Sequence, residues 1–459
     1  MRSLPIFSYT GRAELDLSLR NALLAAIPGT AFFAVIQGSA YTAFVRALTK
    51  QDSIYGLLAA LPLVAGVFRF LSAYLIERYR IRRRVFLAAF YLQRLIWIPF
   101  ALIPYLVPGA LPALRVALAV LCLSAHGIGG ALGDVAFVAW LTDLVPGEIR
   151  GSYLGQRNRV GQLAAMATPL LVGWYLDAHH GFGGLTTVLI AGALLGATDI
   201  ALWHWVIHPP VQASGQPLSL ARMFLEPLRL PAYRKLLAFW TVNLFALGFM
   251  SPFLMVYNLE VLNLSNTEAS LQLQVIPGIL AFILAGTWGR CIDEFGSKPL
   301  LKLCMIGSSL MPLFWIFSTP THPWLQLIPN IMGGAIWVGL DMAQMSLMMK
   351  ILPRENRTAY IAGYGLTAWL VGNASAAMLA GFIADRLHPV VAASGVTIFG
   401  TPLVSYQVLF LISLALRWTA AYVVLPRVEE PEARSMRELL VSILPPARAS
   451  RVASPPNAR

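Results

Sequence analysis

The sequence has 459 residues, of which 58% are hydrophobic and only 12% are charged. An average soluble domain has roughly 25% charged residues, so a chain this apolar lacks the polar side chains to cover a soluble surface. The net charge is +13. Because the basic residues are not gathered on one soluble segment, as a nucleic-acid-binding surface requires, we expect no nucleic-acid partner.

Apolar stretches recur along nearly the whole chain, and each is long enough to cross a bilayer as a helix, which takes about 20 residues. In chain order the predicted spans are 20–46, 54–76, 85–106, 113–142, 153–177, 184–207, 234–262, 268–290, 299–318, 324–350, 358–385 and 402–425. We therefore predict an all-α membrane protein with a six-helix half at 1–207, a polar, Pro-rich linker at 208–233, a second six-helix half at 234–425 and a basic tail at 426–459.

The distribution of positive charge predicts the orientation in the membrane. With twelve spans both termini lie on one side, and the loops on that side hold most of the 34 Lys and Arg residues. The loops on the other side hold only Arg46, Lys50, Arg115 and Arg386. Because cytoplasmic loops carry an excess of Lys and Arg, we predict that the termini, the linker and the tail lie in the cytoplasm and that the protein is a multi-pass protein of the cytoplasmic membrane.

The basic tail contains one amphipathic stretch. Its apolar residues have the helical spacing i, i+3, i+4, i+7, at Met436, Leu439, Leu440 and Ile443. We consider two interpretations: a short helix that lies on the anionic inner leaflet, and a disordered tail.

The two halves share local sequence patterns. Segment 144–153 aligns with 351–360 with Pro, Glu, Arg and Tyr at equivalent positions, and the same offset places Asp134 opposite Asp341. A further matched pair, one residue out of step, is 173–177 (GWYLD) and 381–385 (GFIAD). Several matches in the same order indicate a duplication, and repeated halves are how many transporters place a substrate site at the repeat interface.

The loop after the eighth span has a recognisable sequence. It reads Gly-Arg-Cys-Ile-Asp-Glu-Phe-Gly-Ser-Lys at 289–298, which fits the pattern G-x-x-x-D-x-x-G-x-[RK]. The equivalent loop of the first half, 73–84, is degenerate, with Ala73 and Arg80 in place of the glycines and Glu77 in place of the aspartate. This pattern is the signature loop of the major facilitator superfamily, which the chain resembles over nearly its full length. The resemblance implies twelve helices in two pseudo-symmetric bundles.

The resemblance also implies a latch at the cytoplasmic side. A helix N-terminus has free N–H groups and a partial positive charge that attract a carboxylate. By resemblance, Asp293 would face the start of span five near Tyr153, and Glu77 would face the start of span eleven near Thr358. The other residues of this predicted latch are Gly289, Gly296, Lys298, Arg150 and Arg357. The alternative is that these are ordinary charges of cytoplasmic loops.

Spans one, four, seven and ten line the cavity in this superfamily, so polar and aromatic residues on them are candidates for solute contact. The candidates are Gln37, Tyr41, Asn243, Tyr257, Trp337 and Gln344. Each of them also fits a role in helix packing. Many aromatic residues in a cavity suit an amphipathic or hydrophobic solute.

Two ionisable residues are predicted to form a structural pair inside the membrane. Arg94 and Asp199 each lie about nine or ten residues from the cytoplasmic end of a span, which at 1.5 Å per residue is roughly 14 Å deep. An unpaired charge at that depth is costly. We therefore predict an Arg94–Asp199 ion pair that holds the first half together.

Asp134 and Asp341 are candidates for coupling. They occupy equivalent positions on two cavity-lining spans, also roughly 14 Å deep, where a carboxylate is costly to ionise unless it is paired. A proton carrier has this property. The alternative is structural, in which Asp134 pairs with Arg69 or Arg94 and Asp341 pairs with Arg417.

The sequence as a whole predicts a secondary transporter that moves a small solute by alternating access, with proton-coupled export as the specific form. The alternatives are a facilitator, a lipid-handling flippase, and a sensor or scaffold that transports nothing. No Walker A or H-E-x-x-H motif occurs, so we expect no enzyme activity, catalytic residue, cofactor or metal site. We expect a monomer whose partners are the solute, the bilayer and protons.

Overall fold

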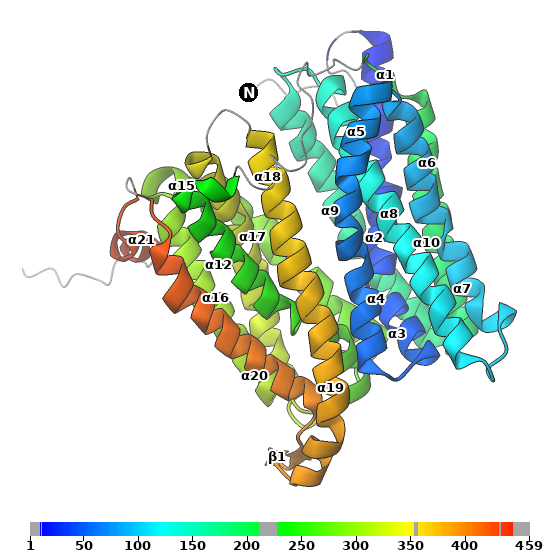
Figure 1. The fold of residues 1–459 in the computed structure, drawn as a ribbon, viewed down its shortest axis with the longest axis vertical. Helices are drawn as coiled ribbons and strands as arrows, with labels where there is room; N and C mark the ends of the chain where they lie inside the picture. Colours follow the sequence, from blue (N-terminus) through cyan, green and yellow to red (C-terminus); the bar gives the residue numbers. More distant parts are fainter. Residues whose placement is uncertain (1–9, 11, 211–226, 353–356, 431–432, 444–459) are drawn as a thin grey trace, which may run out of the picture.

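The computed structural model describes residues 10, 12–210, 227–352, 357–430 and 433–443. The described chain is almost entirely helical (Figure 1), apart from a hairpin of β1 (Thr397–Ile398) and β2 (Thr401–Pro402). Most of the predicted linker lies outside the described residues. Eleven helical stretches of the described chain are long and apolar enough to cross a membrane. The twelfth is α9 (Arg150–Ala178), whose 29 residues are long enough to cross a membrane and which is more polar, with three arginines in its first ten residues.

Breaks in the helices divide most of the spans of the first half into pieces. In chain order these are α1 (Ala13–Leu24), α2 (Ala26–Ile36), α3 (Ser39–Leu48), α4 (Asp52–Val64), η1 (Ala65–Phe68), α5 (Arg69–Tyr79), α6 (Arg82–Leu95), α7 (Trp97–Leu106), α8 (Pro112–Leu144), α9, α10 (Phe182–Leu202) and η2 (Trp203–Trp205). Span one consists of α1, α2 and α3, span two of α4, η1 and α5, and span three of α6 and α7.

The second half repeats this order with more irregular helices. Its elements are η3 (Pro227–Arg229), α12 (Pro231–Gly248), α13 (Phe253–Val256), η4 (Tyr257–Val261), α14 (Asn266–Ser270), η5 (Leu271–Val275), α15 (Ile276–Phe295), α16 (Ser297–Phe317), η6 (Pro323–Gln326), α17 (Leu327–Ile351), α18 (Arg357–Leu366), η7 (Thr367–Ala374), α19 (Ser375–Ser394), α20 (Ser405–Trp418), η8 (Thr419–Val424), η9 (Leu425–Arg427) and α21 (Met436–Ile443). The segments η4, η5, η7 and η8 are π-helical. Such π turns widen a helix locally and frequently occur at functional sites.

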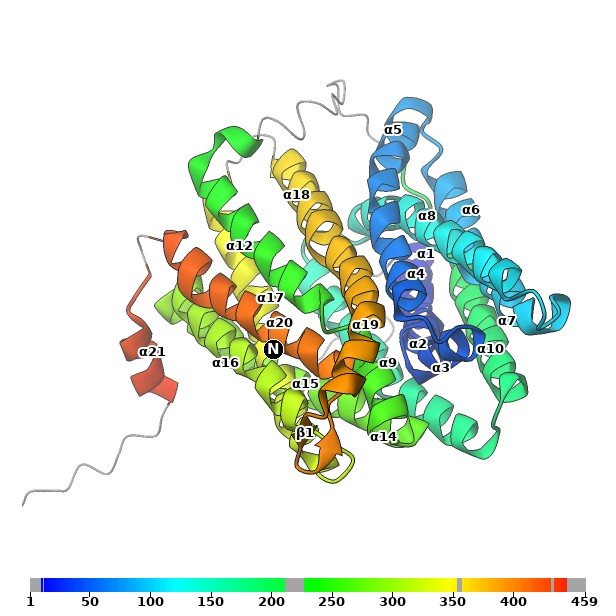
Figure 2. The ribbon, with the colours of Figure 1, turned by 60° about the horizontal axis from the view of Figure 1, so that its bottom comes forward.

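The two halves form two bundles that lie side by side (Figures 1 and 2). We call the end that carries Arg82, Arg150, Lys298 and Lys350 the basic end, and the end that carries Arg46 and the termini of α9 and α19 at Ala178 and Ser394 the opposite end. The halves pack through α4 against α19 and η7 and through α9 against α14 and η5. Toward the basic end, α12 and α15 diverge from the first half. The protein is therefore closed at the opposite end.

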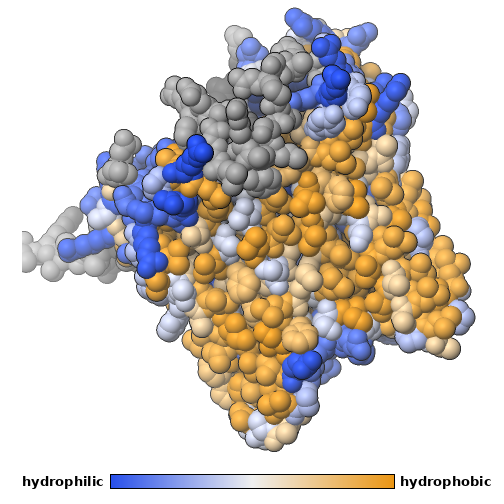
Figure 3. Space-filling view, in the orientation of Figure 1, coloured by the Kyte–Doolittle hydropathy of each residue, from blue (hydrophilic) through white to orange (hydrophobic). Residues whose placement is uncertain are grey.

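The surface explains the hydropathy of the sequence. Apolar residues cover the sides of both bundles in the space-filling view, and hydrophilic residues gather toward the basic end (Figure 3). Large apolar side chains such as Leu163, Leu171 and Trp174 are more than half exposed. Contiguous apolar surface of this extent is typical of a protein whose sides face lipid.

Candidate functional site

The end of α9 is attached to the start of α14 in the other half by one carboxylate. Asp177 Oδ1 accepts hydrogen bonds from the backbone N–H of Asn266 (2.8 Å) and from its side-chain Nδ2 (3.0 Å). Asp177 Oδ2 accepts from the backbone N–H (3.1 Å) and the hydroxyl (2.6 Å) of Thr267. These are the first two residues of α14, where the N–H groups lack partners in the helix and the end has a partial positive charge. Asp177 is therefore a helix cap supplied by the other half.

The same contact is repeated between α19 and α4. Asp385 Oδ1 accepts a hydrogen bond from the N–H of Asp52 (2.8 Å), and Asp385 Oδ2 accepts from the N–H of Ser53 (2.9 Å). Asp52 and Ser53 are the first two residues of α4. Asp177 and Asp385 end the matched segments 173–177 and 381–385, so the duplicated sequence makes the same cap twice, once in each direction between the halves.

A glycine four residues before each aspartate lets the helices approach closely. A Cβ added at Gly173 would lie 2.6 Å from Thr267 Cα, and one added at Gly381 would lie 2.2 Å from Asp52 O. Real Cβ atoms essentially never come this near to backbone atoms. The pattern G-x-x-x-D thus supplies both a smooth surface for contact and the carboxylate that caps the partner helix.

A buried ion network reinforces the closure beside Asp385. Arg46 on α3 contacts Asp52 (2.7 Å) and Glu260 on η4 (2.7 Å), and Lys50 contacts Glu260 (2.6 Å). Arg46 is 6% exposed and Asp52 is 0% exposed. Buried charges are stable only when they are paired and hydrogen-bonded, so this network holds the ends of spans one, two and seven together.

The second half supplies two more partners to Asp52. His388 on α19 donates from Nε2 to Asp52 Oδ2 (2.7 Å), and the hydroxyl of Tyr406 on α20 donates to Asp52 Oδ1 (2.8 Å). Asp52, Asp385 and His388 lie close enough together to hold a metal ion. However, their ligand atoms already bind backbone N–H groups, Arg46 and Tyr406, so the arrangement fits an ion network between the two halves.

A cavity of about 380 Å³ lies beneath this closure, between the two halves. It is lined by α2–α4, α7 and α8 of the first half and by residues of η7, α19 and the α12–α13 region of the second half. Its polar side chains are Gln37, Tyr41, Thr42, Tyr55, His126, Ser251 and Asn373. Gln37 lies at the break between α2 and α3, so a polar side chain faces the cavity where span one is interrupted.

The other predicted cavity residues occupy different places. Asn243 and Tyr257 are buried, and the hydroxyl of Tyr257 donates to the carbonyl of Ser318 (2.5 Å). The ring of Trp337 lies under the guanidinium of Arg417, 5.6 Å from the ring centre. Gln344 forms a hydrogen bond with the hydroxyl of Tyr364. Of the predicted set, the structure brings Gln37 and Tyr41 together on one cavity wall.

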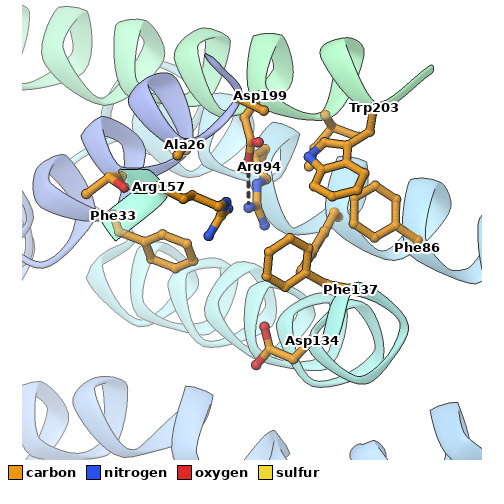
Figure 4. Close-up of a pocket in the computed structure, with 14 residues that line it drawn as sticks. Ala26, Phe33, Phe86, Arg94, Asp134, Phe137, Arg157, Asp199 and Trp203 are labelled. Carbon is orange, nitrogen blue, oxygen red and sulfur yellow. Dashed lines mark hydrogen bonds and ion pairs between the residues drawn. The ribbon is translucent and has the colours of Figure 1, made fainter. Parts of the chain in front are cut away.

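The ion pair expected between Arg94 and Asp199 is present, with Arg94 Nη2 3.1 Å from Asp199 Oδ2 (Figure 4). Arg94 is 3% exposed and its guanidinium also lies 4.2 Å from the centre of the Phe90 ring. The pair joins α6 to α10 within the first half. The predicted ion pair is therefore confirmed.

The two candidate coupling aspartates have different surroundings. Asp134 pairs with Arg69 (3.1 Å), and both side chains are about half exposed. Asp341 is exposed and makes no hydrogen bond or ion pair with any described residue. Arg417 does not pair with Asp341, since it donates to the carbonyl (3.1 Å) and hydroxyl (3.0 Å) of Ser308. Of the two, Asp341 is the aspartate without a structural partner in the described chain.

The signature loop lies at the basic end, and its aspartate is not engaged. Asp293 is exposed near the end of α15 and has no partner among the described residues. Gly289 lies on the same helix, and Gly296 has a φ of +91°, which favours glycine. Arg150 donates to the carbonyls of Thr142 (3.0 Å) and Val145 (3.2 Å) at the end of α8.

The first-half copy of the latch is described only in part. Glu77 is half-buried near the end of α5. The start of α18, which Glu77 would face, borders the undescribed residues 353–356, and the side chains of Arg357 and Thr358 are outside the described part of the chain. The predicted contact therefore stays a prediction.

The tail returns to the signature loop. Glu430 accepts hydrogen bonds from the N–H groups of Ser297 (3.2 Å) and Lys298 (2.6 Å) at the start of α16, and it pairs with Lys350 (2.6 Å). The amphipathic stretch forms α21, whose Leu439 is fully buried against the second half. The stretch is therefore helical, and Leu439 packs against the second half of the protein; its predicted contact with the inner leaflet stays a prediction.

Comparisons with known proteins place this architecture in a family. The sequence matches the profile of the Major Facilitator Superfamily over residues 22–377. The chain belongs to the major facilitator superfamily. It is a membrane transporter of that superfamily, with twelve helices in two bundles.

Three solved structures and one curated protein are informative. The nucleoside transporter NupG superposes with a TM-score of 0.65 at 13% identity, covering 90% of this chain and 99% of that one. The D-xylose–proton symporter superposes with a TM-score of 0.65 at 17% identity, covering 90% of this chain and 99% of that one. The inward-open xylose transporter XylE from E. coli superposes with a TM-score of 0.63 at 15% identity, covering 92% of this chain and 98% of that one. These identities support the fold alone. The class H tetracycline resistance protein of Pasteurella multocida is 33% identical over 103 residues, 22% of this chain and 25% of that protein, so the match spans a quarter of its length.

We expect Gly173→Val to weaken the closure at the opposite end, because the added side chain would collide with Thr267. Overpacking of this kind costs about 1–3 kcal/mol, which shifts the population of the closed state by roughly five- to a hundredfold. The measurement is the rate at which an impermeant maleimide, added at the opposite side, modifies a cysteine introduced at Tyr41. Gly155→Val on the same helix is the matched control, because a Cβ there meets nothing within 4 Å. Equal rates in the two variants would contradict the role of Gly173.

The docking of the tail should depend on pH through Glu430. Burial alone would raise the pKa of Glu430, but the Lys350 ammonium and the N–H groups of Lys298 and Ser297 outweigh it and hold that pKa below its ordinary value of 4.5. The cap is therefore fully present above about pH 4.5 and is lost as the pH falls below that value. A spin label at Ser442 should become more mobile as the pH falls below about 4.5. In Glu430→Gln the label should be more mobile already at neutral pH. Unchanged mobility in Glu430→Gln would show that the cap does not hold the tail.

Proposed function

We propose that the protein is a secondary active transporter that moves a small solute across the cytoplasmic membrane by alternating access, in a form that faces the cytoplasm here. The observation that carries this proposal is the contrast between the two ends. The caps by Asp177 and Asp385 are formed at the opposite end, while Asp293 at the basic end is exposed and has no partner in the described part of the chain. The excess of Lys and Arg at the basic end favours its placement in the cytoplasm.

The same two helix pairs have a carboxylate at each end. Asp177, at the end of span five, caps the start of span eight, and Asp293, at the end of span eight, would cap the start of span five. Asp385, at the end of span eleven, caps the start of span two, and Glu77, at the end of span two, would cap the start of span eleven. We infer that closing the basic end forms the second set of caps as the first set breaks.

For the energy source we propose proton coupling through Asp341. It lies on α17, one helical turn before Gln344, and it has no ion-pair partner in the described chain. Asp134, the equivalent residue of the first half, already pairs with Arg69. A carboxylate without an ion-pair partner can take up and release a proton during a transport cycle. For the direction we propose export, which the match to a tetracycline resistance protein supports.

Neutralising the caps should move the conformational equilibrium in opposite directions. Asp177→Asn and Asp385→Asn should reduce the population that is open at the basic end, and Asp293→Asn should increase it. Each contact between a carboxylate and a helix terminus contributes roughly 0.3–2 kcal/mol, which corresponds to a shift of up to about thirtyfold. The readout is the modification rate of a cysteine at Gln162, which lines the cavity between the halves near α15.

The matched control for Asp293 is Glu294→Gln, since Glu294 is the exposed neighbouring acid. It should leave the modification rate unchanged. A shift in the same direction for Asp177→Asn and Asp293→Asn would refute the exchange of caps. Unchanged rates in all three cap variants would remove the caps from the mechanism.

Asp341→Asn should abolish transport driven by a pH gradient and preserve solute exchange between equal pools. Proteoliposomes with an internal pH reporter and a panel of solutes would measure both. Asp134→Asn is the control and should retain pH-driven transport. Retained pH-driven transport in Asp341→Asn would favour a facilitator or another coupling residue. A wild-type protein that moves no solute of a broad panel would favour the sensor or scaffold.

A further inference from the structure

A recess within the first half has no assigned role. It has a volume of about 220 Å³ and lies between the α1–α2 segment, α6, α8, α9 and the end of α10 (Figure 4). Its aromatic wall consists of Phe33, Phe86, Phe90, Phe137 and Trp203. Phe86 and Trp203 are almost fully buried, so the wall is a fixed part of the core.

The charges that line this recess do not balance. Asp199 pairs with Arg94 and is also near enough to attract Arg157. Asp134 faces the recess but pairs with Arg69. Arg157 makes no hydrogen bond or ion pair with any described residue, and its guanidinium lies 5.0 Å from the centre of the Phe137 ring. The recess therefore holds one positive charge more than its own residues neutralise.

Two guanidinium donors in this recess are unused. The Nε atoms of Arg157 and Arg94 are both buried and have no hydrogen-bond partner among the residues that the structure describes. In Figure 4 the guanidinium groups of both arginines point into the same space. Buried polar groups are normally hydrogen-bonded, and an exception calls for an explanation such as a missing ligand.

The recess opens to the cavity between the halves. Ala26, Thr30 and Arg157 border both the recess and a second cavity of about 470 Å³. The second half contributes Phe282, Ala285 and Val338 to that cavity. Its described lining contains Arg157 and Arg159 and no carboxylate. A solute that enters from the basic end would therefore meet an apolar wall on one side and arginines on the other.

We propose that Arg157 binds the carboxylate of an amphipathic organic monoanion, with the body of the anion against the aromatic wall, and that this anion is the class of solute transported. This inference rests on the proposed function. A guanidinium fork binds a carboxylate through two parallel hydrogen bonds, and Phe and Trp rings favour an apolar or aromatic body. One uncompensated positive charge matches one negative charge.

Binding to the purified full-length protein in phosphatidylcholine nanodiscs tests the proposal without requiring transport. Isothermal titration calorimetry would compare 2-naphthoate, benzoate and decanoate with the neutral 2-naphthamide. We expect at least one carboxylate to bind, and the naphthamide to bind about ten- to a hundredfold more weakly than naphthoate, as for the loss of a charge-assisted contact. Failure of all three carboxylates to bind, or equal binding of naphthoate and naphthamide, would overturn the proposal.

Variants locate the site. Arg157→Gln should weaken binding by about the same factor, Arg157→Lys by less, and Arg84→Gln, an exposed arginine on α6, should leave it unchanged. Arg157 makes no hydrogen bond or ion pair with any described residue, and its contact with the Phe137 ring is what the substitution removes. The melting temperature of Arg157→Gln, compared with that of Arg84→Gln, separates loss of binding from misfolding. Unchanged binding in Arg157→Gln would overturn the proposal. Release of bound naphthoate by added phosphatidylglycerol would also overturn it, because it would assign the recess to a lipid headgroup.

The outcomes also separate this proposal from the transport mechanism. Binding of a carboxylate that depends on Arg157 but is never followed by its movement across the membrane would support the site and refute transport. Transport of a neutral solute by Arg157→Gln at the wild-type rate would support transport and refute the assignment of the solute class.

Discussion

The closure depends on the contact between a carboxylate at the end of one helix and the N-terminus of a helix in the other half. The first N–H groups of a helix have no partner within it, and the end has a partial positive charge. Asp177 and Asp385 satisfy these groups on α14 and α4. Each contact is worth only roughly 0.3–2 kcal/mol. Two such contacts stabilise one arrangement of the halves and can still be exchanged on the time scale of transport.

The duplication explains why the contacts occur in pairs. Because the halves repeat one six-helix plan, a G-x-x-x-D segment at the end of span five recurs at the end of span eleven, and each meets the helix that begins beside it in the other half. The ion network of Arg46, Asp52 and Glu260 adds an asymmetric element to this plan. It lies only beside the Asp385 cap, so the two caps are not equivalent, and this side of the interface has the larger number of buried charges.

Much of the fold could be predicted from the sequence. The architecture could be predicted from twelve apolar stretches, the distribution of positive charge and one signature loop. The pairing of Arg94 with Asp199 could be predicted from their positions within two spans. The caps were not predicted. The sequence contained their signal, since 173–177 and 381–385 were already aligned as a repeat, but the partners Asn266 and Asp52 lie 89 and 333 residues away from the two aspartates along the chain.

The candidate solute contacts were harder to predict, for a physical reason. A helix in lipid is apolar on every side, so its periodicity does not reveal which side faces a cavity. Gln37 and Tyr41 line the cavity, while Asn243 and Tyr257 on another cavity-lining span are buried in helix contacts. Arg157 was not among the candidates because it lies on span five, and its lack of a partner is visible only in three dimensions.

The central claim is that the two ends close alternately, and distances between spin labels across both ends would test it most directly. One pair, Gly151 and Glu294, spans the basic end, and the other, His180 and Asn263, spans the opposite end. In nanodiscs over a range of pH and with bound solute, the account predicts that the first distance shortens in the same population in which the second lengthens. Two distances that shorten and lengthen together, or a distance across the basic end that never changes, would contradict it.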